Sequence, residues 1–233
     1  MMGHAGMAAL AVRYLRPAGP PAPGARPPGP MPRPALRAVR ADEQPPPPPG
    51  ELRRVLGRFA SGVTVITAPG AGGEPPAGFA CQSFASLSLD PPLVVFMVGR
   101  TSTTWPRIAR AGVFCVNILG AGQGALCRAF AASGAQSADK FTGVRHSPAP
   151  VTGSPLLVGV PAWVDCEIHA VHTGGDHLIV VGRVEALGAE ENGGREGDEG
   201  AERGEGGEGG DADQGGPLIF HRSAFGTFTA FDA

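Results

Sequence analysis

Hydrophobic residues in the first folded segment follow a helical period. Four of them recur at the i, i+3, i+4, i+7 spacing of one helix face, namely Leu52, Val55, Leu56 and Phe59. This spacing predicts a helix that begins at Glu51, and Gly62 is the residue type that commonly ends one. We therefore expect ordered structure to begin at residue 51.

Short β-branched and aromatic runs follow this helix and predict strands. Residues 63–67 and 77–88 flank a turn-forming segment and are expected to pair as a hairpin, the second run forming one strand or a strand with a bulge. The continuous apolar run 93–98 is typical of a strand buried on both faces. Further strands are expected at 113–119, 162–172, 177–187 and 218–221, with a tight turn at 173–176.

Only two more helices are expected. One begins at Trp105-Pro106, because proline is tolerated in a first helical turn, and the other spans residues 125–132. Many strands with few helices predict a mainly β fold, a small closed β-barrel with helices packed outside. Closure is favoured over an open sheet because it leaves no unpaired edge strand.

Glycine and proline divide the chain, because they are concentrated outside the predicted core. Residues 1–50 are rich in arginine and proline, contain no serine and end in a proline run, which predicts a disordered tail rather than a targeting peptide. Residues 189–216 consist largely of Gly, Glu and Asp. Such a segment buries too little apolar surface to fold, so we expect a disordered acidic insert within a domain that spans 51–233.

Charge and cysteine content narrow the range of partners. A net charge of −2 indicates neither nucleic acid nor an anionic membrane surface as partner. No apolar run approaches the roughly 20 residues of a membrane-spanning helix, so a soluble chain is expected. The four cysteines form no CxxC pair and lie among apolar or small residues, which is typical of buried thiols in a cytoplasmic protein.

Two motifs suggest other kinds of site. Residues 120–125 match the G-x-G-x-x-G/A pattern of a dinucleotide-binding dehydrogenase, but no second parallel strand follows them. Four potential zinc ligands lie close in sequence: Cys166, His169, His172 and His177. Successive side chains of a strand point to opposite faces, so these residues do not converge, and no metal is expected.

Several pieces of the chain resemble, in the same order, the flavin reductase family. They are residues 56–67, 78–93, 114–119, 139–141, 174–177 and 220–222. Within that family, residues 80–84 are most similar to the reductase partner of a seco-steroid hydroxylase. The resemblance implies an FMN-binding split β-barrel, a homodimer, FMN or FAD as hydride acceptor, NADH or NADPH as donor, and a partner monooxygenase.

The resemblance also implies the site residues. The flavin ring is expected to lie on Ala80, Cys81, Gln82, Ser83, Phe84, Ser86 and Leu87. The flavin phosphate and tail are expected near Arg100, Thr101, Ser102, Thr103, Lys140 and Phe141. His177 is expected on the nicotinamide side as the catalytic position, and His221 and Arg222 beside the pyridine nucleotide. Hydroxyls ahead of a helix N-terminus suit an anion independently of the resemblance.

The expected function is therefore that of an NAD(P)H-dependent flavin reductase, an enzyme that supplies reduced flavin to a monooxygenase. The flavin carries the difficult chemistry, so the protein needs to hold the ring, anchor the phosphate and leave one face open for the nicotinamide. A flavin-binding protein of the same barrel without turnover is the main alternative, and a Rossmann-type dehydrogenase is a second one.

Overall fold

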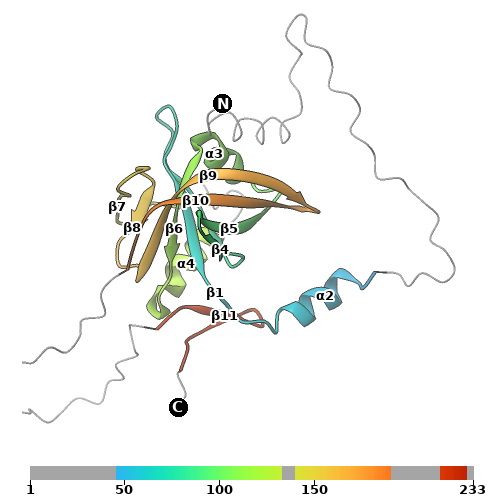
Figure 1. Ribbon diagram of the computed structural model, residues 1–233. Coiled ribbons are helices and arrows are strands. Elements are labelled where there is room, and N and C mark those ends of the chain that lie inside the picture. The colour runs from blue at the N-terminus through green and yellow to red at the C-terminus, as the bar shows by residue number, and fades with distance from the viewer. Residues whose placement is uncertain (1–45, 133–139, 190–215, 230–233) are drawn as a thin grey trace, which may run out of the picture.

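The structure is a computed structural model that describes residues 46–132, 140–189 and 216–229 (Figure 1). Residues 1–45 of the expected tail and 190–215 of the expected insert, and Asp139, thus lie outside the described residues. The helices are α2 (Pro49–Leu56), α3 (Trp105–Ala111), α4 (Gly124–Ala131) and the 3-10 turn η1 (Ala121–Gln123). The strands are β1 (Ser61–Gly62), β2 (Thr64–Ala68), β3 (Ala77–Cys81), β4 (Ala85–Leu89), β5 (Pro92–Gly99), β6 (Val113–Ile118), β7 (His146–Pro148), β8 (Pro155–Leu157), β9 (Ala162–Gly174), β10 (His177–Ala189), β11 (Ile219–His221) and β12 (Ala224–Gly226).

A seven-stranded antiparallel sheet forms the body of the molecule, in the order β3-β2-β6-β9-β10-β5-β4. The mainly β architecture with few helices is thereby confirmed, as is the hairpin of β2 and β3. The β9–β10 hairpin is also confirmed, and its two-residue turn contains Gly175 at φ 69°, a backbone conformation that suits glycine. The larger core cluster lies on one face of this sheet, where the Phe96 and Phe114 rings pack edge-to-face at 5.2 Å between centroids.

The expected closure of the barrel is wrong, because β3 and β4 remain the two edges of the sheet. The segment 77–88, expected to be one strand or a strand with a bulge, is in fact β3 and β4, separated by three residues that belong to no strand. Cys81 is in the core and Phe84 packs against it, although residues three apart in one strand point to opposite faces. The intervening Gln82 and Ser83 therefore interrupt the strand and turn the chain from one edge to the other.

β5 also differs from its expectation, since it is buried on one face only. Val94, Phe96 and Val98 are buried, whereas Met97 between them is 40 % exposed. An antiparallel sheet that packs its core on one side exposes alternate residues of each strand, even when all of them are apolar.

A second group of buried residues lies beneath α4. Phe130 of α4 packs there with Val63 and Val65, which flank the start of β2, and with Leu157 of β8. This packing brings the C-terminal end of α4 against β3.

The hairpin of β7 and β8 was not expected, because buried polar side chains rather than an apolar pattern hold it on the sheet. Asn117 of β6 donates to the carbonyl of Val65 over 3.2 Å and accepts from the Leu157 N–H over 2.8 Å. Asp165 accepts the backbone N–H groups of Val151 and Thr152, each over 3.0 Å. These buried side chains satisfy backbone groups of the hairpin that the sheet leaves unpaired.

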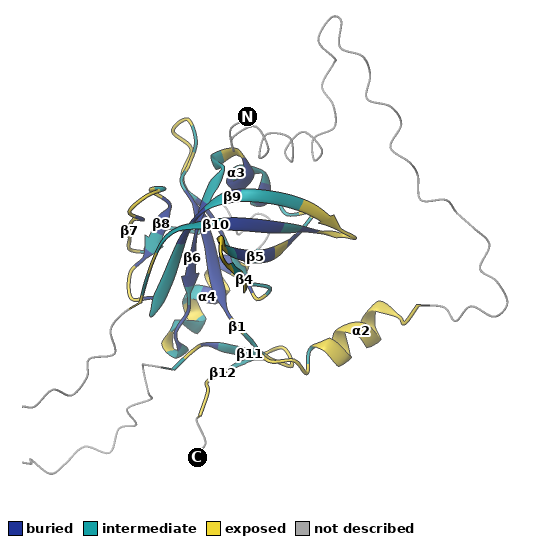
Figure 2. Ribbon diagram, in the orientation of Figure 1, coloured by how far each residue is buried: buried dark blue, intermediate teal, exposed yellow. Residues whose placement is uncertain are grey.

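α2 is the helix expected from the sequence, although it begins two residues earlier and none of its residues is buried (Figure 2). Leu56 is 61 % exposed and Phe59, just after the helix, 80 %. The helix projects from a small sheet of β1, β11 and β12. The backbone N–H of Arg222, in the β11–β12 turn, donates to the carbonyl of Gly57, the residue that follows the helix. In the part of the chain that the structure describes, no helix has the length and apolar character needed to cross a membrane.

The glycine-rich motif at residues 120–125 is a connection between β6 and α4. Every strand pairing within the described ranges is antiparallel, so β6 begins no parallel βαβ unit. The side chain of Gln123 instead accepts from the Gly120 N–H over 2.8 Å and donates to the Gly159 carbonyl over 2.9 Å. The motif thus serves as a braced turn.

Candidate functional site

An open cavity of about 520 Å³ lies where β3, β5 and the loop before α3 meet the C-terminal end of α4. Its size falls within the range of small-molecule and cofactor sites. The lining residues are Phe79, Ala80, Cys81, Gln82, Ser83, Met97, Val98, Gly99, Thr101, Ser102, Thr103, Thr104, Phe130, Ala131, Ala132, Lys140 and His177.

Nine residues expected at the site from the sequence line this cavity, and they come from four segments far apart in the chain. They are Ala80, Cys81, Gln82, Ser83, Thr101, Ser102, Thr103, Lys140 and His177. Seven others lie outside the lining: Phe84, Ser86, Leu87, Arg100, Phe141, His221 and Arg222.

One wall of the cavity is the end of β3 and the two residues that follow it. Ser83 Oγ accepts from the Met97 N–H and donates to the Met97 carbonyl, each over 2.9 Å. The Ser61 hydroxyl lies 3.4 Å from Oε1 of Gln82. Burial raises the pKa of the Cys81 thiol, so this side chain stays protonated and contributes a small, neutral surface.

The hydroxyl loop, residues Thr101–Thr104, forms a second wall. Ser102 Oγ accepts from the Trp105 N–H over 3.2 Å and so caps α3. The hydroxyls of Thr101 and Thr103 make no hydrogen bond to the described residues. Because α3 has only seven residues, we expect the hydroxyls of Thr101 and Thr103 to contribute more to the binding of an anion than the helix dipole does.

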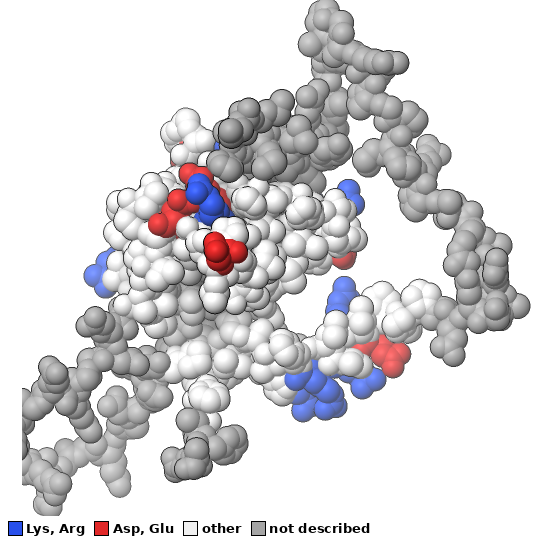
Figure 3. Space-filling model, in the orientation of Figure 1, with Lys and Arg blue, Asp and Glu red and all other residues white. Residues whose placement is uncertain are grey.

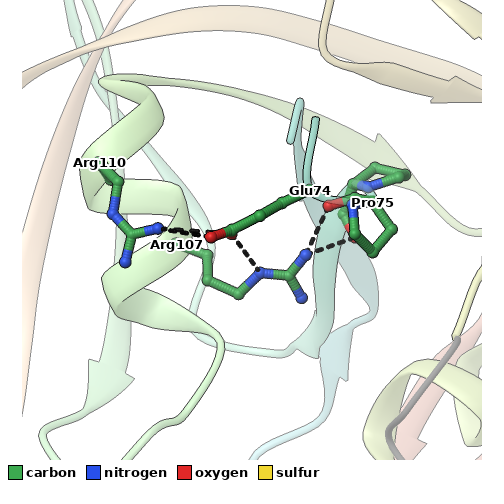
Figure 4. A network of polar contacts seen from close by, with 5 residues as sticks. Glu74, Pro75, Arg107 and Arg110 are labelled. Carbon is green, nitrogen blue, oxygen red and sulfur yellow. Dashed lines mark hydrogen bonds and ion pairs between the residues drawn. The ribbon is translucent and has the colours of Figure 1, made fainter. Parts of the chain in front are cut away.

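A polar network joins α3 to the β2–β3 connection (Figure 4). Glu74, in the β2–β3 connection, lies 3.2 Å from an Arg110 nitrogen and 3.7 Å from Nε of Arg107. Arg107 also donates to the carbonyls of Pro75 and Pro76, just before β3. α3 and β3 are thereby tied together beside the cavity that they share.

Lys140 contributes the one cationic side chain among the lining residues. Its Nζ donates to the carbonyl of Phe130 at the end of α4 over 2.8 Å, and partial burial lowers its pKa. Phe141 packs edge-on against Phe130 at 5.1 Å between centroids, so it supports the wall from behind. Lys140 is thus placed to meet an anion on the side of the cavity formed by α4.

His177 stands at the mouth of the cavity, at the first position of β10. Its Nδ1 lies 2.8 Å from Oδ1 of Asp176, and this hydrogen bond holds the pKa of Asp176 below its ordinary value. Arg100 braces the same turn, since its N–H donates to the Asp176 carbonyl over 3.0 Å. A guanidinium nitrogen of Arg100 lies 3.4 Å from the Gly175 carbonyl.

The remaining expected residues take other places. Phe84 packs on the core, while Ser86 and Leu87 are exposed on β4. His221 and Arg222 lie at the β11–β12 turn beside α2, where arginines gather (Figure 3). These two residues are not brought to the cavity within one chain.

Several lining residues were missed by sequence reasoning, notably Met97, Gly99, Phe130 and Ala131. Met97 belongs to the run 93–98 that was expected to be buried on both faces, Gly99 follows that run directly, and a helix end carries no local sign of lining a cavity. Across the described ranges, no three side chains of His, Cys, Asp or Glu form a group able to hold a metal ion.

The cavity suits a planar cofactor with an anionic tail. Small neutral side chains form one wall, and hydroxyls and an amine lie where an anion would be held. This donor set fits a flavin nucleotide, whose ring needs a flat surface and hydrogen-bond donors and whose phosphate needs positive charge.

Comparison with known proteins agrees with this fit. A reductase subunit of a flavin-dependent monooxygenase, HsaB of Rhodococcus jostii, is 48 % identical over 60 % of this chain and 68 % of its own length. A flavin reductase of Pseudomonas putida is 43 % identical over 77 % of this chain and 89 % of its own.

A solved structure extends the comparison to the fold. The NADH:FAD oxidoreductase of Streptomyces globisporus, in complex with NAD and FAD fragments, matches with a TM-score of 0.61 and 33 % identity. The match covers 77 % of this chain and 92 % of that one. The model of the flavin reductase like domain also matches residues 56–229. The chain therefore belongs to the flavin reductase-like family.

Proposed function

We propose that the protein is an NAD(P)H:flavin oxidoreductase that supplies reduced FMN or FAD to a partner monooxygenase. The observation that carries this proposal is the convergence, in one cavity, of the β3 end, the hydroxyl loop, Lys140 and His177 in a member of this family. The relative from Rhodococcus jostii is a monooxygenase reductase subunit. FAD and NADH are the pair to test first, because the Streptomyces globisporus relative is an NADH:FAD oxidoreductase.

In this proposal the residues have distinct roles. A bound flavin would supply the hydride-accepting chemistry, and the protein would bind and orient the flavin and the nicotinamide. Residues 80–83 hold the flavin ring, Thr101, Thr103 and Lys140 hold its phosphate, and His177 contacts the nicotinamide. No group of the chain needs to abstract a proton, which agrees with the neutral thiol and hydroxyls of the wall.

We also propose a homodimer of split-barrel subunits. The sheet stays open between β3 and β4, and the three residues that connect these strands belong to no strand, as suits a barrel that is split. The apolar stripe of α2, formed by Leu52, Val55 and Leu56, is exposed and continuous along one helix face. A second copy is the partner that would bury this stripe, and it would set His221 and Arg222 near a nucleotide site.

We assign the protein to the cytoplasm and keep its domain limits as expected, from 51 to 233 with a tail and an acidic insert. The four buried cysteines are all free, as suits a reducing compartment.

Deletion of residues 193–215 should leave folding and turnover nearly intact, and a large loss of activity would contradict this assignment of the insert.

One assay distinguishes the reductase from a flavin-binding protein without turnover. NADH and NADPH oxidation is followed by absorbance with added FMN, FAD or riboflavin. We expect at least one flavin to accelerate nucleotide oxidation in proportion to enzyme concentration. Tight flavin binding without any acceleration would support the non-catalytic alternative and overturn the reductase proposal.

A further inference from the structure

The hydroxyl of Ser83 lies just beyond the first residue pair of β4 and β5, where these strands no longer pair through their backbones. β4 pairs with β5 through Ala85 and Val95, and this register, continued by two residues, sets Ser83 opposite Met97. In an antiparallel ladder, a residue pair of this kind exchanges two backbone hydrogen bonds. Here Ser83 Oγ makes both of them, accepting from the Met97 N–H and donating to the Met97 carbonyl over 2.9 Å each.

Because the Ser83 hydroxyl takes the place of backbone groups in these two hydrogen bonds, the wall of the cavity is affected as well. In the described part of the chain, the backbone N–H of Gln82 donates to no carbonyl, whereas the backbone N–H of Ser83 is directed to the Cys81 sulfur. The Ser83 hydroxyl, in contrast, is already engaged by the Met97 carbonyl over 2.9 Å and also lies 3.2 Å from Cys81 Sγ. The backbone amide of Gln82, and not the Ser83 hydroxyl, is therefore the donor that this part of the wall offers.

We propose that Ser83 is a positioning residue that pins the flavin-binding wall to β5 and does not itself donate to the flavin. The inference rests on the proposed flavin site and assigns a role within it. Two hydrogen bonds to one residue fix the hydroxyl in direction as well as distance, and Met97 also lines the cavity. The pin thus sets the spacing between the two strands at the point where the ring lies.

Serine side chains elsewhere on this edge provide a matched control. Ser88 of β4 makes no side-chain hydrogen bond to the described residues and does not line the cavity. Ser83→Ala removes the pin, Ser83→Thr keeps a hydroxyl, and Ser88→Ala removes a hydroxyl that pins nothing. Comparison of the three separates the pin from a general effect of losing a serine.

The test measures FMN and FAD affinity, thermal unfolding, and hydrogen exchange at the Met97 amide with and without flavin. We expect Ser83→Ala to weaken flavin binding about tenfold, a free-energy change at the upper end for one lost hydrogen bond. Ser83→Thr should restore most of the affinity, and Ser88→Ala should bind as the wild type. In the wild type, the Met97 amide should stay protected when flavin binds.

Loss of protection at the Met97 amide of the wild type on flavin binding would overturn the inference, because it would mean that the hydroxyl turns to the ring. Equal flavin affinity in the wild type and Ser83→Ala would also overturn it. If Ser83→Ala fails to fold, the exchange measurement on the wild type still decides. A wild-type protein that binds no flavin at all would instead overturn the proposed function.

Discussion

The ring of Phe130 lies against the bare backbone of Gly78, so closely that a Cβ at that position would stand 2.7 Å from Cε1 of the ring. This contact lets α4 approach β3 and places the end of the helix at the cavity. Gly78→Ala should force α4 outward, costing about 2 kcal/mol of unfolding free energy and weakening flavin binding.

Gly122→Ala is the matched control for Gly78→Ala, because a Cβ at residue 122 meets nothing within 4 Å. Chemical unfolding and flavin titration of both variants check the prediction. Equal stability of the two variants would contradict it. A loss of nucleotide binding in Gly122→Ala would revive the Rossmann alternative.

Replacement of Lys140 should weaken the binding of a flavin that carries a phosphate and leave the binding of riboflavin unchanged. Lys140→Met removes the positive charge that Lys140 contributes to the cavity wall, so we expect the Kd of FMN to rise by about thirtyfold, which corresponds to ~2 kcal/mol and lies within the range for a hydrogen bond to a charged group. Riboflavin lacks the phosphate, and its Kd should be unchanged. Fluorescence titration with both flavins makes the measurement. A parallel loss of riboflavin affinity would show that Lys140 acts through the Phe130 carbonyl instead.

His177 should affect the nicotinamide more than the flavin. His177→Asn is expected to raise the KM for NADH about tenfold, because a ring contact at the cavity mouth is lost, and to leave the Kd of flavin nearly unchanged. His172→Asn, on the exposed part of β9, serves as control and should behave as the wild type. Steady-state kinetics with separate flavin titrations provides the test. An equal loss in flavin affinity would place His177 on the flavin side.

The exposed stripe of α2 should decide the oligomeric state. Leu56→Glu sets a charge in the proposed interface, so we expect dimers to dissociate into monomers in sedimentation velocity. Arg54→Gln, on a residue 65 % exposed that pairs with Glu51, should leave the dimer intact. A Leu56→Glu protein that remains dimeric would exclude α2 from the interface.

Buried thiols should make stability decline in alkaline solution. Burial raises the pKa of Cys115 from 9.0 to about 12, so folding keeps this thiol protonated after the unfolded chain has begun to ionise. The resulting stabilisation is complete below pH 9 and is lost as pH rises from 9 toward 12.

Urea unfolding in reducing buffer, at several values across this range, should give a shallower decline for Cys115→Ser than for the wild type. The serine hydroxyl does not ionise in this range. Identical slopes for the two proteins would contradict the assignment to Cys115.

The sequence alone determined the elements with strong local signals. The apolar spacing of Leu52, Val55 and Leu56 predicted α2, and the Gly174-Gly175-Asp176 turn predicted the longest hairpin of the sheet. The resemblance to the flavin reductase family indicated nine of the residues that line the cavity, and six of them lie in the ordered pieces that carry it. These features depend on neighbours in the chain, so a local pattern is sufficient to reveal them.

Tertiary structure alone decided where the sheet ends and which donors face the cavity. Residues 77–88 read as one strand, yet Ser83 binds the backbone of Met97, fourteen positions away, and the segment divides between the two edges. The β7–β8 hairpin likewise depends on Asn117 and Asp165, whose partners are distant in sequence. Pairings of this kind are satisfied only when the chain has folded, because a side chain selects its backbone partner by proximity in space and not by spacing in sequence.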